Sequence, residues 1–239
     1  MDFLRKNFTY IKMPFGRFMN EAASDQQLYL RAVSSSRPAD SPADLGQDYP
    51  EIAHDFLLPD TLHFVRDNAH SSPLRISGPV TMWLHYDVMA NVLCQIQGRK
   101  RLVLFPPHRV TDLFFPAGAS SSSFEVFDNE GNIKAELYNL GPIVCDLHPG
   151  DVLFIPAVWP HAAFPIDGYS VAVNVFFRSL QKGYAAGRDV YANRDLQAYE
   201  TGRKDVQRIV KAFKGIPPDI SRFYLSRLAQ ELREAASSS

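Results

Sequence analysis

Two histidines and one aspartate are the residues whose types and spacing best suit catalysis. His85 and Asp87 stand two positions apart in WLHYD (83–87), so on a β-strand both side chains point to the same face. His161 ends the segment GDVLFIPAVWPH (150–161), in which a turn leads into an apolar strand that breaks at proline. Two histidines and one carboxylate would form a facial triad, which leaves coordination positions open on the metal, as non-haem Fe(II) oxygenases require.

Lys100 follows this pair in the chain and could add an anion-binding group. It has the same strand parity as Leu102 and Leu104, which would direct it inward, but it is also the middle of the basic run 99–101. Periodicity alone supports the buried and the exposed orientation equally. A lysine inside a barrel needs an anion because an unpaired buried ammonium is costly, and the distal carboxylate of a dicarboxylate co-substrate would serve.

Short apolar runs separated by turn residues dominate the chain from residue 76 to residue 177. Their length and their β-branched and aromatic content are typical of strands, and Gly98, Gly150 and Gly168 mark turns between them. Several short strands at this spacing predict a mainly β fold, either a sandwich or a barrel. The expected strands are 80–85, 92–96, 102–105, 143–147, 152–155 and 170–177.

The segments around these strands carry different signals. Residues 1–35 indicate mixed local structure, and residues 36–50, with three prolines and a glycine, indicate a loop. The segment AGASSSS (117–123) is expected to be a mobile surface loop. We therefore expect one domain over 1–180 and a different organisation after it.

Two amphipathic helices are predicted within residues 181–239. The first has apolar residues at i, i+3, i+4 and i+7 and ends before Gly215 and Pro217, and the second follows directly. Such faces could cover the barrel or pack on a second copy of the chain, so this extension is a candidate dimerisation element. The apolar residues are Val206, Ile209, Val210 and Phe213, then Ile220, Phe223, Leu225, Leu228 and Leu232.

Composition excludes several classes of protein. The 239 residues are 46% hydrophobic and 21% charged, which is typical of a globular chain and not of a disordered one. No apolar run approaches the length of a membrane span, and the first residues lack a secretory signal, so a cytoplasmic setting is expected, with a nuclear one as the alternative. Cys94 and Cys145 form no CxxC motif, which argues against a disulfide scaffold or a thiolate zinc site.

Charge is distributed unevenly along the chain. Residues 1–20 carry a net charge of +3 and residues 181–239 a net charge of +4, whereas residues 21–180 carry −8, for a total of −1. Basic ends around an acidic middle are compatible with a polyanionic partner, although ordinary helix-surface charge would give the same pattern.

A family resemblance rests on motifs that occur in order from residue 8 to residue 180. HYDVMANVLCQIQGRKRLVLFPP (85–107) resembles the core of JmjC-type, cupin-fold 2-oxoglutarate oxygenases, and GDVLFIPAVWPH resembles the segment that supplies their last metal ligand. The resemblance implies a double-stranded β-helix, Fe(II), 2-oxoglutarate and O2. It implies iron ligation by His85, Asp87 and His161, a distal-carboxylate clamp of Tyr29 and Lys100, and support from Asn91 and Asn174.

Within that family the chain resembles the wybutosine branch of tRNA modification. HYDVM-x-N, G-x-KR-x-x-LF-x-P and YLR are shared with its hydroxylase, and the same module resembles the carboxy-terminal JmjC-like domain of the fungal wybutosine methyltransferase/methoxycarbonyltransferase. The resemblance implies carbon hydroxylation of the modified base of tRNA(Phe) by a homodimer. The chain would be either an enzyme in its own right or an excised domain of a longer one. A protein side-chain hydroxylase and a non-catalytic binding domain are the alternatives. Met82 stands where the family often has a threonine that contacts the co-substrate.

Overall fold

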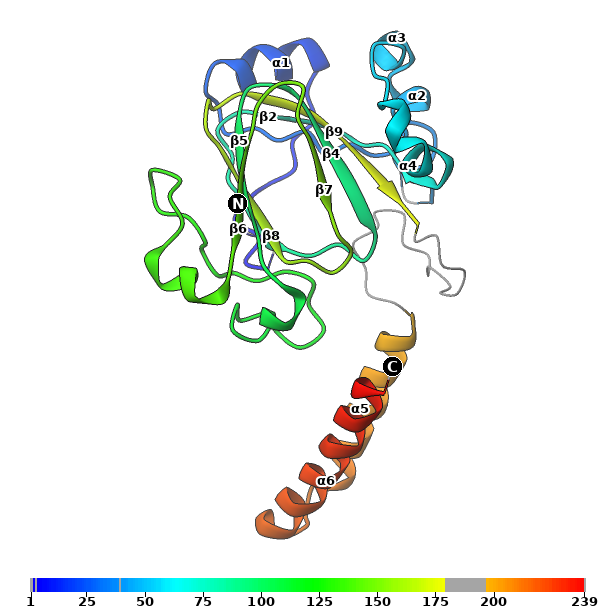
Figure 1. The fold of residues 1–239 in the computed structure, drawn as a ribbon, viewed down its shortest axis with the longest axis vertical. Helices are drawn as coiled ribbons and strands as arrows, with labels where there is room; N and C mark the ends of the chain where they lie inside the picture. Colours follow the sequence, from blue (N-terminus) through cyan, green and yellow to red (C-terminus); the bar gives the residue numbers. More distant parts are fainter. Residues whose placement is uncertain (1, 3, 39, 179–196, 239) are drawn as a thin grey trace. The chain divides into compact units, whose positions relative to one another are not determined.

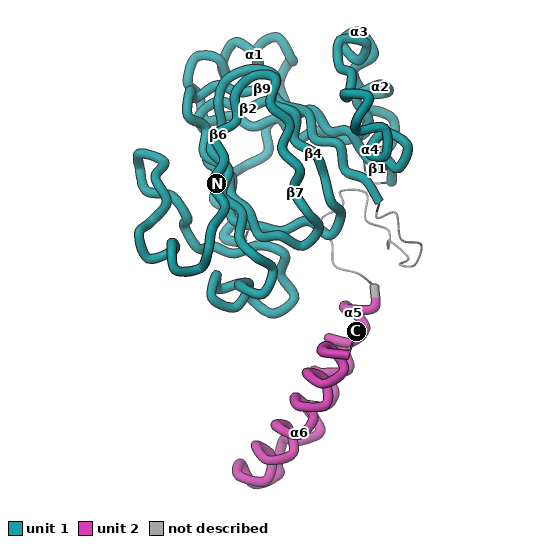
Figure 2. The backbone as a smooth tube through the Cα atoms, in the orientation of Figure 1, with its two compact units in different colours: residues 1–195 teal, residues 196–239 magenta. Residues whose placement is uncertain are grey.

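The computed structural model describes residues 2, 4–38, 40–178 and 197–238 and divides the chain into two compact units. The first unit comprises residues 1–195 and the second residues 196–239 (Figure 2). The boundary expected between residues 180 and 181 lies outside the described residues.

The first unit consists of two antiparallel β-sheets that enclose the core (Figure 1). From β3 to β5 and again from β6 to β9, the chain alternates between the sheets, which is the winding of a double-stranded β-helix. One sheet has the order β1-β9-β4-β7, with β2 also paired to β9. Its strands are β1 (Ala69–Ser71), β2 (Leu74–Ser77), β4 (Ala90–Gln97), β7 (Val152–Ile155) and β9 (Ser170–Phe177). The other sheet has the order β3-β8-β5-β6. Its strands are β3 (Met82–His85), β8 (His161–Pro165), β5 (Lys100–Leu104) and β6 (Ile143–Leu147).

This architecture confirms the mainly β prediction, although the described strands form two sheets and not a closed barrel. Strands β6, β7 and β9 have the predicted bounds, because each is a mainly apolar run between turn residues. Strand β8 was not predicted: the prolines around Trp159 suggested that regular structure stops before His161, but His161 is the first residue of this strand.

Short helices cover the outer face of the first sheet. Helices α1 (Phe15–Ala23), α2 (Leu45–Asp48), α3 (Pro50–Ala53) and α4 (His63–Asp67) lie on this side of the unit (Figure 1). Phe18, Ala22, Leu45 and Val65 are buried there against strand residues such as Val92 and Val175. Helix α2 corrects the prediction of a loop over 36–50: the Asp44 side chain accepts a hydrogen bond from the Gln47 backbone N–H at 2.9 Å and so caps one helical turn.

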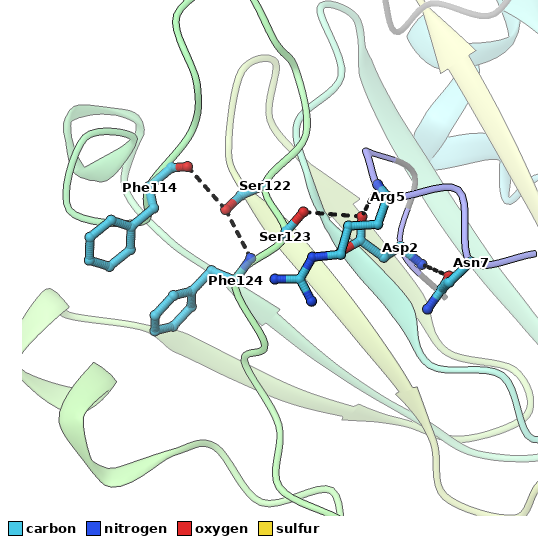
Figure 3. A network of polar contacts seen from close by, with 7 residues as sticks. All are labelled: Asp2, Arg5, Asn7, Phe114, Ser122, Ser123 and Phe124. Atoms are coloured by element: carbon cyan, nitrogen blue, oxygen red, sulfur yellow. Dashed lines mark hydrogen bonds and ion pairs between the residues drawn. The ribbon is translucent and has the colours of Figure 1, made fainter.

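The serine-rich segment 117–123 is not the free surface loop that the sequence suggested. Ser121 and Ser122 are buried, and Ser121 forms an isolated antiparallel bridge with His85. The Ser122 backbone N–H donates to the Leu84 carbonyl at 2.9 Å, and its hydroxyl donates to the Leu113 carbonyl at 2.8 Å. The Ser122 side chain also satisfies nearby backbone groups, because its hydroxyl donates to the Phe114 carbonyl and accepts from the Phe124 backbone N–H (Figure 3).

The second unit contains the two predicted helices, α5 (Gln197–Ala212) and α6 (Pro218–Ser237). Gly215, with a φ of 94°, and Pro217 lie in the turn between them, as expected for a helix end followed by a helix start. Among the described residues of these helices none is buried, and Val206, Val210 and Phe223 are exposed. Neither these helices nor any other described helix is long and apolar enough to cross a membrane.

Candidate metal centre

The two candidate histidine ligands face each other across adjacent strands. His85 on β3 and His161 on β8 are paired in the sheet register, and their ring centroids are 4.4 Å apart. Each Nδ1 lies 2.9 Å from the carbonyl oxygen of the residue two positions earlier, Trp83 and Trp159 respectively. Because a carbonyl only accepts, each Nδ1 must carry the proton, which leaves the Nε2 lone pairs free to bind a metal.

Asp87 completes this group just beyond the end of β3. Its side chain is buried, and its Oδ2 lies 3.7 Å from Nε2 of His161. One ligand atom from each of His85, Asp87 and His161 lies within 4.8 Å of the others, and no other such group occurs among the described residues. The donor set of two imidazoles and one carboxylate suits Fe(II) and related divalent transition metals.

The protonation states of the histidines favour metal binding. Burial, with smaller contributions from His161 and Arg75, lowers the pKa of His85 to about 3, despite the opposing hydrogen bond to Trp83. Burial also lowers the pKa of His161, and the Arg75 charge adds to this effect. Both imidazoles are therefore neutral at neutral pH, which is the form that binds a metal.

Lys100 points into the molecule, whereas its neighbours point out. Its side chain is buried on β5, while Arg99 and Arg101 are paired with Asp167 and Asp146, each at 2.7 Å. Burial, reinforced by the Arg75 charge, lowers the pKa of Lys100 to about 8. Within the part of the chain that the structure describes, no carboxylate forms an ion pair with this lysine. A buried cation of this kind needs an anionic ligand.

Asn91, Asn174 and Arg75 form a polar chain on the inner face of the other sheet. Asn174 Nδ2 donates to Asn91 Oδ1 at 2.7 Å, and Arg75 Nε donates to Asn174 Oδ1 at 3.3 Å. Nδ2 of Asn91 is buried and has no hydrogen-bond acceptor among the described residues. Sequence reasoning missed Arg75; the available signal was an arginine alternating with Leu74 and Ile76 in a strand-like run.

A cavity of about 1180 Å³ opens onto two of the three candidate metal ligands. His85 and Asp87 line it together with Tyr29 and Arg75, whereas His161, Lys100, Asn91 and Asn174 are buried and are not among its lining residues. Tyr29 forms an isolated bridge with Ser77 of β2, which holds it beside the sheet. Met82, the departure from the family pattern, also lines the cavity.

Comparison with known proteins places the chain in a family. The family model described as "Cupin-like domain" matches residues 1–183. The chain is 56% identical over 236 residues to tRNA wybutosine-synthesizing protein 4 of Aspergillus oryzae, covering 99% of this chain but only 23% of that protein. It is 34% identical to tRNA wybutosine-synthesizing protein 5 of Danio rerio, covering 99% of this chain and 74% of that protein, and 32% identical to the Homo sapiens protein 5, covering 99% and 77%.

The family match covers most of the first unit, and the protein 5 relatives align along nearly the whole chain. The two sheets and the histidine–aspartate group described above lie within the matched residues. The chain therefore belongs to the cupin-like domain family, together with tRNA wybutosine-synthesizing proteins 4 and 5.

Proposed function

We propose that the chain is an Fe(II)/2-oxoglutarate-dependent hydroxylase that acts on the modified base next to the anticodon of tRNA(Phe). The observation that carries this proposal is the convergence of His85, Asp87 and His161, the first two of which line a cavity of about 1180 Å³. The relatives named for wybutosine synthesis support the substrate.

The residues around this group fit iron and a dicarboxylate. His85, Asp87 and His161 would hold the metal through two neutral imidazoles and one carboxylate. The ammonium of Lys100 and the orphaned Nδ2 of Asn91 are donors that need acceptors, and a dicarboxylate supplies acceptors at both of its ends. Tyr29 would assist Lys100 at the distal carboxylate, and Asn174 would orient Asn91 through their hydrogen bond.

With 2-oxoglutarate and O2, the metal would supply oxidative decarboxylation, in which substrate R–H becomes R–OH while 2-oxoglutarate becomes succinate and CO2. The protein positions the reactants for this step. The carbonyls of Trp83 and Trp159 orient the two imidazoles, and the buried side chain of Lys100 fixes the position of the co-substrate.

The test is mass spectrometry of tRNA(Phe) that carries the tricyclic wybutosine-type base. Incubation with the protein, Fe(II), 2-oxoglutarate and O2 should add 16 mass units to that nucleoside, at roughly one succinate per hydroxylation. Omission of 2-oxoglutarate, or Asp87→Ala, should abolish the mass change. Succinate formation without any change in the RNA would contradict the tRNA substrate.

A protein side-chain hydroxylase is the second candidate. The net charge of −8 over residues 21–180 favours it, because an acidic surface repels RNA and attracts basic peptides. Incubation with a peptide library under the same conditions would reveal this activity.

We further propose a cytoplasmic homodimer held together by α5 and α6, whose exposed apolar residues supply the contact.

A further inference from the structure

Aromatic rings form an unbroken row from a metal ligand to the protein surface. The ring of Trp83 lies 5.5 Å from that of His85 and 6.4 Å from that of Phe8, to which it is nearly parallel, with an interplanar angle of 9°. Tyr10 lies 5.7 Å from Phe8, and the Arg31 guanidinium sits 4.9 Å above the Tyr10 ring. All five residues line the cavity that opens onto the metal ligands. We call Phe8, Tyr10 and Trp83 the aromatic wall.

The segment that carries two of these rings is held in place near its start. The Asp2 carboxylate is buried and accepts hydrogen bonds from the Arg5 backbone N–H at 2.9 Å and from the Ser123 hydroxyl at 3.2 Å, while the Asp2 backbone N–H donates to the Asn7 side chain (Figure 3). Ser123 belongs to the segment that bridges to His85 through Ser121. The aromatic wall is therefore tied to the same part of the fold as the metal ligand.

Tyr10 is 65% exposed although it lies at a cavity, and Phe8 is partly exposed. Rings that serve only to stabilise a fold are normally buried, since burial is the source of their stabilising effect. A row of accessible rings beside a reactive centre instead offers faces on which a flat ligand can stack.

The charge of the cavity is opposite to that of the surrounding chain. Lys12, Arg31 and Arg75 are the basic residues that line it, and the metal-ligand candidate Asp87 is the only acidic one among the described lining residues. Residues 21–180 as a whole carry a net charge of −8. The acidic side chains are thus placed elsewhere, and the cavity suits a ligand that is both aromatic and anionic.

We propose that the aromatic wall stacks the modified base of the substrate RNA and that Arg31 contacts an adjoining phosphate. This assignment rests on the proposed function and specifies which residues recognise the substrate. Stacking on aromatic side chains together with arginine contacts to phosphate is the usual way in which proteins bind unpaired bases. A peptide side chain would leave most of a cavity of about 1180 Å³ unfilled and would not need three rings.

The experiment compares two anticodon stem-loops, one with the tricyclic base and one with guanosine at the same position. Binding to the full chain is measured by fluorescence anisotropy with Mn(II) in place of iron. The wild type should prefer the tricyclic base by about tenfold or more, and Phe8→Ala and Tyr10→Ala should reduce this preference below threefold. Tyr10→Phe should retain it, as should Tyr138→Ala, a matched control that is 60% exposed and outside the cavity lining.

Arg31→Ala should weaken the binding of both stem-loops to a similar extent. It should also reduce the salt dependence of binding by the equivalent of about one phosphate contact. Arg66→Ala, on helix α4, is the matched control and should change neither quantity. Emission from Trp83 gives a readout that does not depend on alanine variants. In Trp159→Phe, Trp83 is the remaining tryptophan, and the tricyclic stem-loop should quench it more strongly than the guanosine one.

An unchanged base preference in both Phe8→Ala and Tyr10→Ala would overturn the assignment, as would the absence of Trp83 quenching. If the wild type still hydroxylates the RNA in that case, the proposed function stands and only the aromatic wall fails. If the wild type binds neither stem-loop but hydroxylates a peptide, the RNA substrate and this assignment both fail.

Discussion

The backbone N–H of Val158 donates a hydrogen bond to the backbone carbonyl of Asp87 at 2.8 Å. This bond joins the turn that precedes His161 to a candidate ligand more than seventy positions earlier in the chain. Val158 has a φ of 59°, in the left-handed region that β-branched residues rarely adopt. A strained residue therefore holds the two ligand segments together.

Val158→Gly is expected to leave the free energy of unfolding unchanged or to raise it by up to about 1 kcal/mol. Left-handed backbone costs a side-chain-bearing residue roughly 1–2 kcal/mol, while glycine adds a smaller entropic cost. Chemical denaturation measures the change. Val152→Gly, in strand β7, is the control, because Val152 is 38% exposed and Val158 is 43% exposed. This control should lower the free energy of unfolding by roughly 1 kcal/mol. A comparable loss of stability in the two variants would contradict the inference that Val158 is strained.

Metal binding should depend on each member of the candidate ligand group. His85→Ala or Asp87→Ala should abolish stoichiometric Fe(II) binding and 2-oxoglutarate turnover, because the two remaining protein ligands are too few to hold the metal tightly. Isothermal titration and turnover assays measure both, and circular dichroism should show a retained fold. His54→Ala, at an exposed histidine, is the control. Tight stoichiometric iron binding in a variant that combines His85→Ala and Asp87→Ala would refute the assignment.

Lys100→Ala should raise the dissociation constant of 2-oxoglutarate by two decades or more. Removing one partner of a buried charge pair costs roughly 3–5 kcal/mol, because the other charge is left unpaired. Arg101→Ala, which removes the neighbouring outward-facing pair with Asp146, is the control and should change this constant little. A change below threefold for Lys100→Ala would leave Tyr29 as the main clamp.

The pH dependence of co-substrate binding should report on the same lysine. Because burial and Arg75 lower the pKa of Lys100 to about 8, the ligand-free protein loses this positive charge as the pH rises through that value. The affinity for 2-oxoglutarate should therefore decrease above about pH 8 in the wild type. Lys100→Arg stays charged over this range, so its affinity should not show that decrease. Titrations between pH 7 and pH 9.5 test this difference.

The two C-terminal helices should mediate self-association. Most of their apolar residues are exposed, and exposed apolar stripes of this kind are stabilised by a partner. Truncation after Gly202 should convert a dimer into a monomer in light scattering. Ile209→Asp should have the same effect, and Gln207→Asp, at an exposed polar position of the same helix, should not. An unchanged oligomeric state after truncation would refute dimerisation through these helices.

Charge reversal at Lys204, Arg208 and Lys211 should weaken tRNA binding. These residues lie along helix α5, and contacts of basic side chains with phosphates make affinity fall steeply with salt. Uncoupled 2-oxoglutarate turnover should be unaffected. Reversal of Arg37, Arg66 and Lys134, in the first unit, keeps the net charge equal and is the control. Salt-insensitive binding of the wild type would favour the protein-hydroxylase candidate.

Most of the elements and the candidate ligands could be predicted from the sequence because they depend on local patterns. Apolar runs between turn residues identified strands such as Ile143–Leu147, and the 3.6-residue period identified the helices near Val206 and Phe223. The same-face spacing of His85 and Asp87 is likewise a property of a few adjacent residues. The segment that ends at His161 is also a local pattern, and the resemblance to a family added Tyr29, Asn91 and Asn174 by position.

Tertiary structure decided the features that depend on contacts between distant segments. Alternation permits either orientation of Lys100, and the sheet buries it because Arg99 and Arg101 find aspartates on the outer side. Tyr10 carries no local signal of a role, and the only local signal of Arg75 is its alternation with Leu74 and Ile76. Each acquires its position only when strands and loops far apart in sequence line one cavity. Serine composition predicts mobility for 117–123, whereas hydrogen bonds to strand β3 fix that segment beside His85. Local patterns determine which element a residue joins, but its neighbours are determined by how the sheets pack.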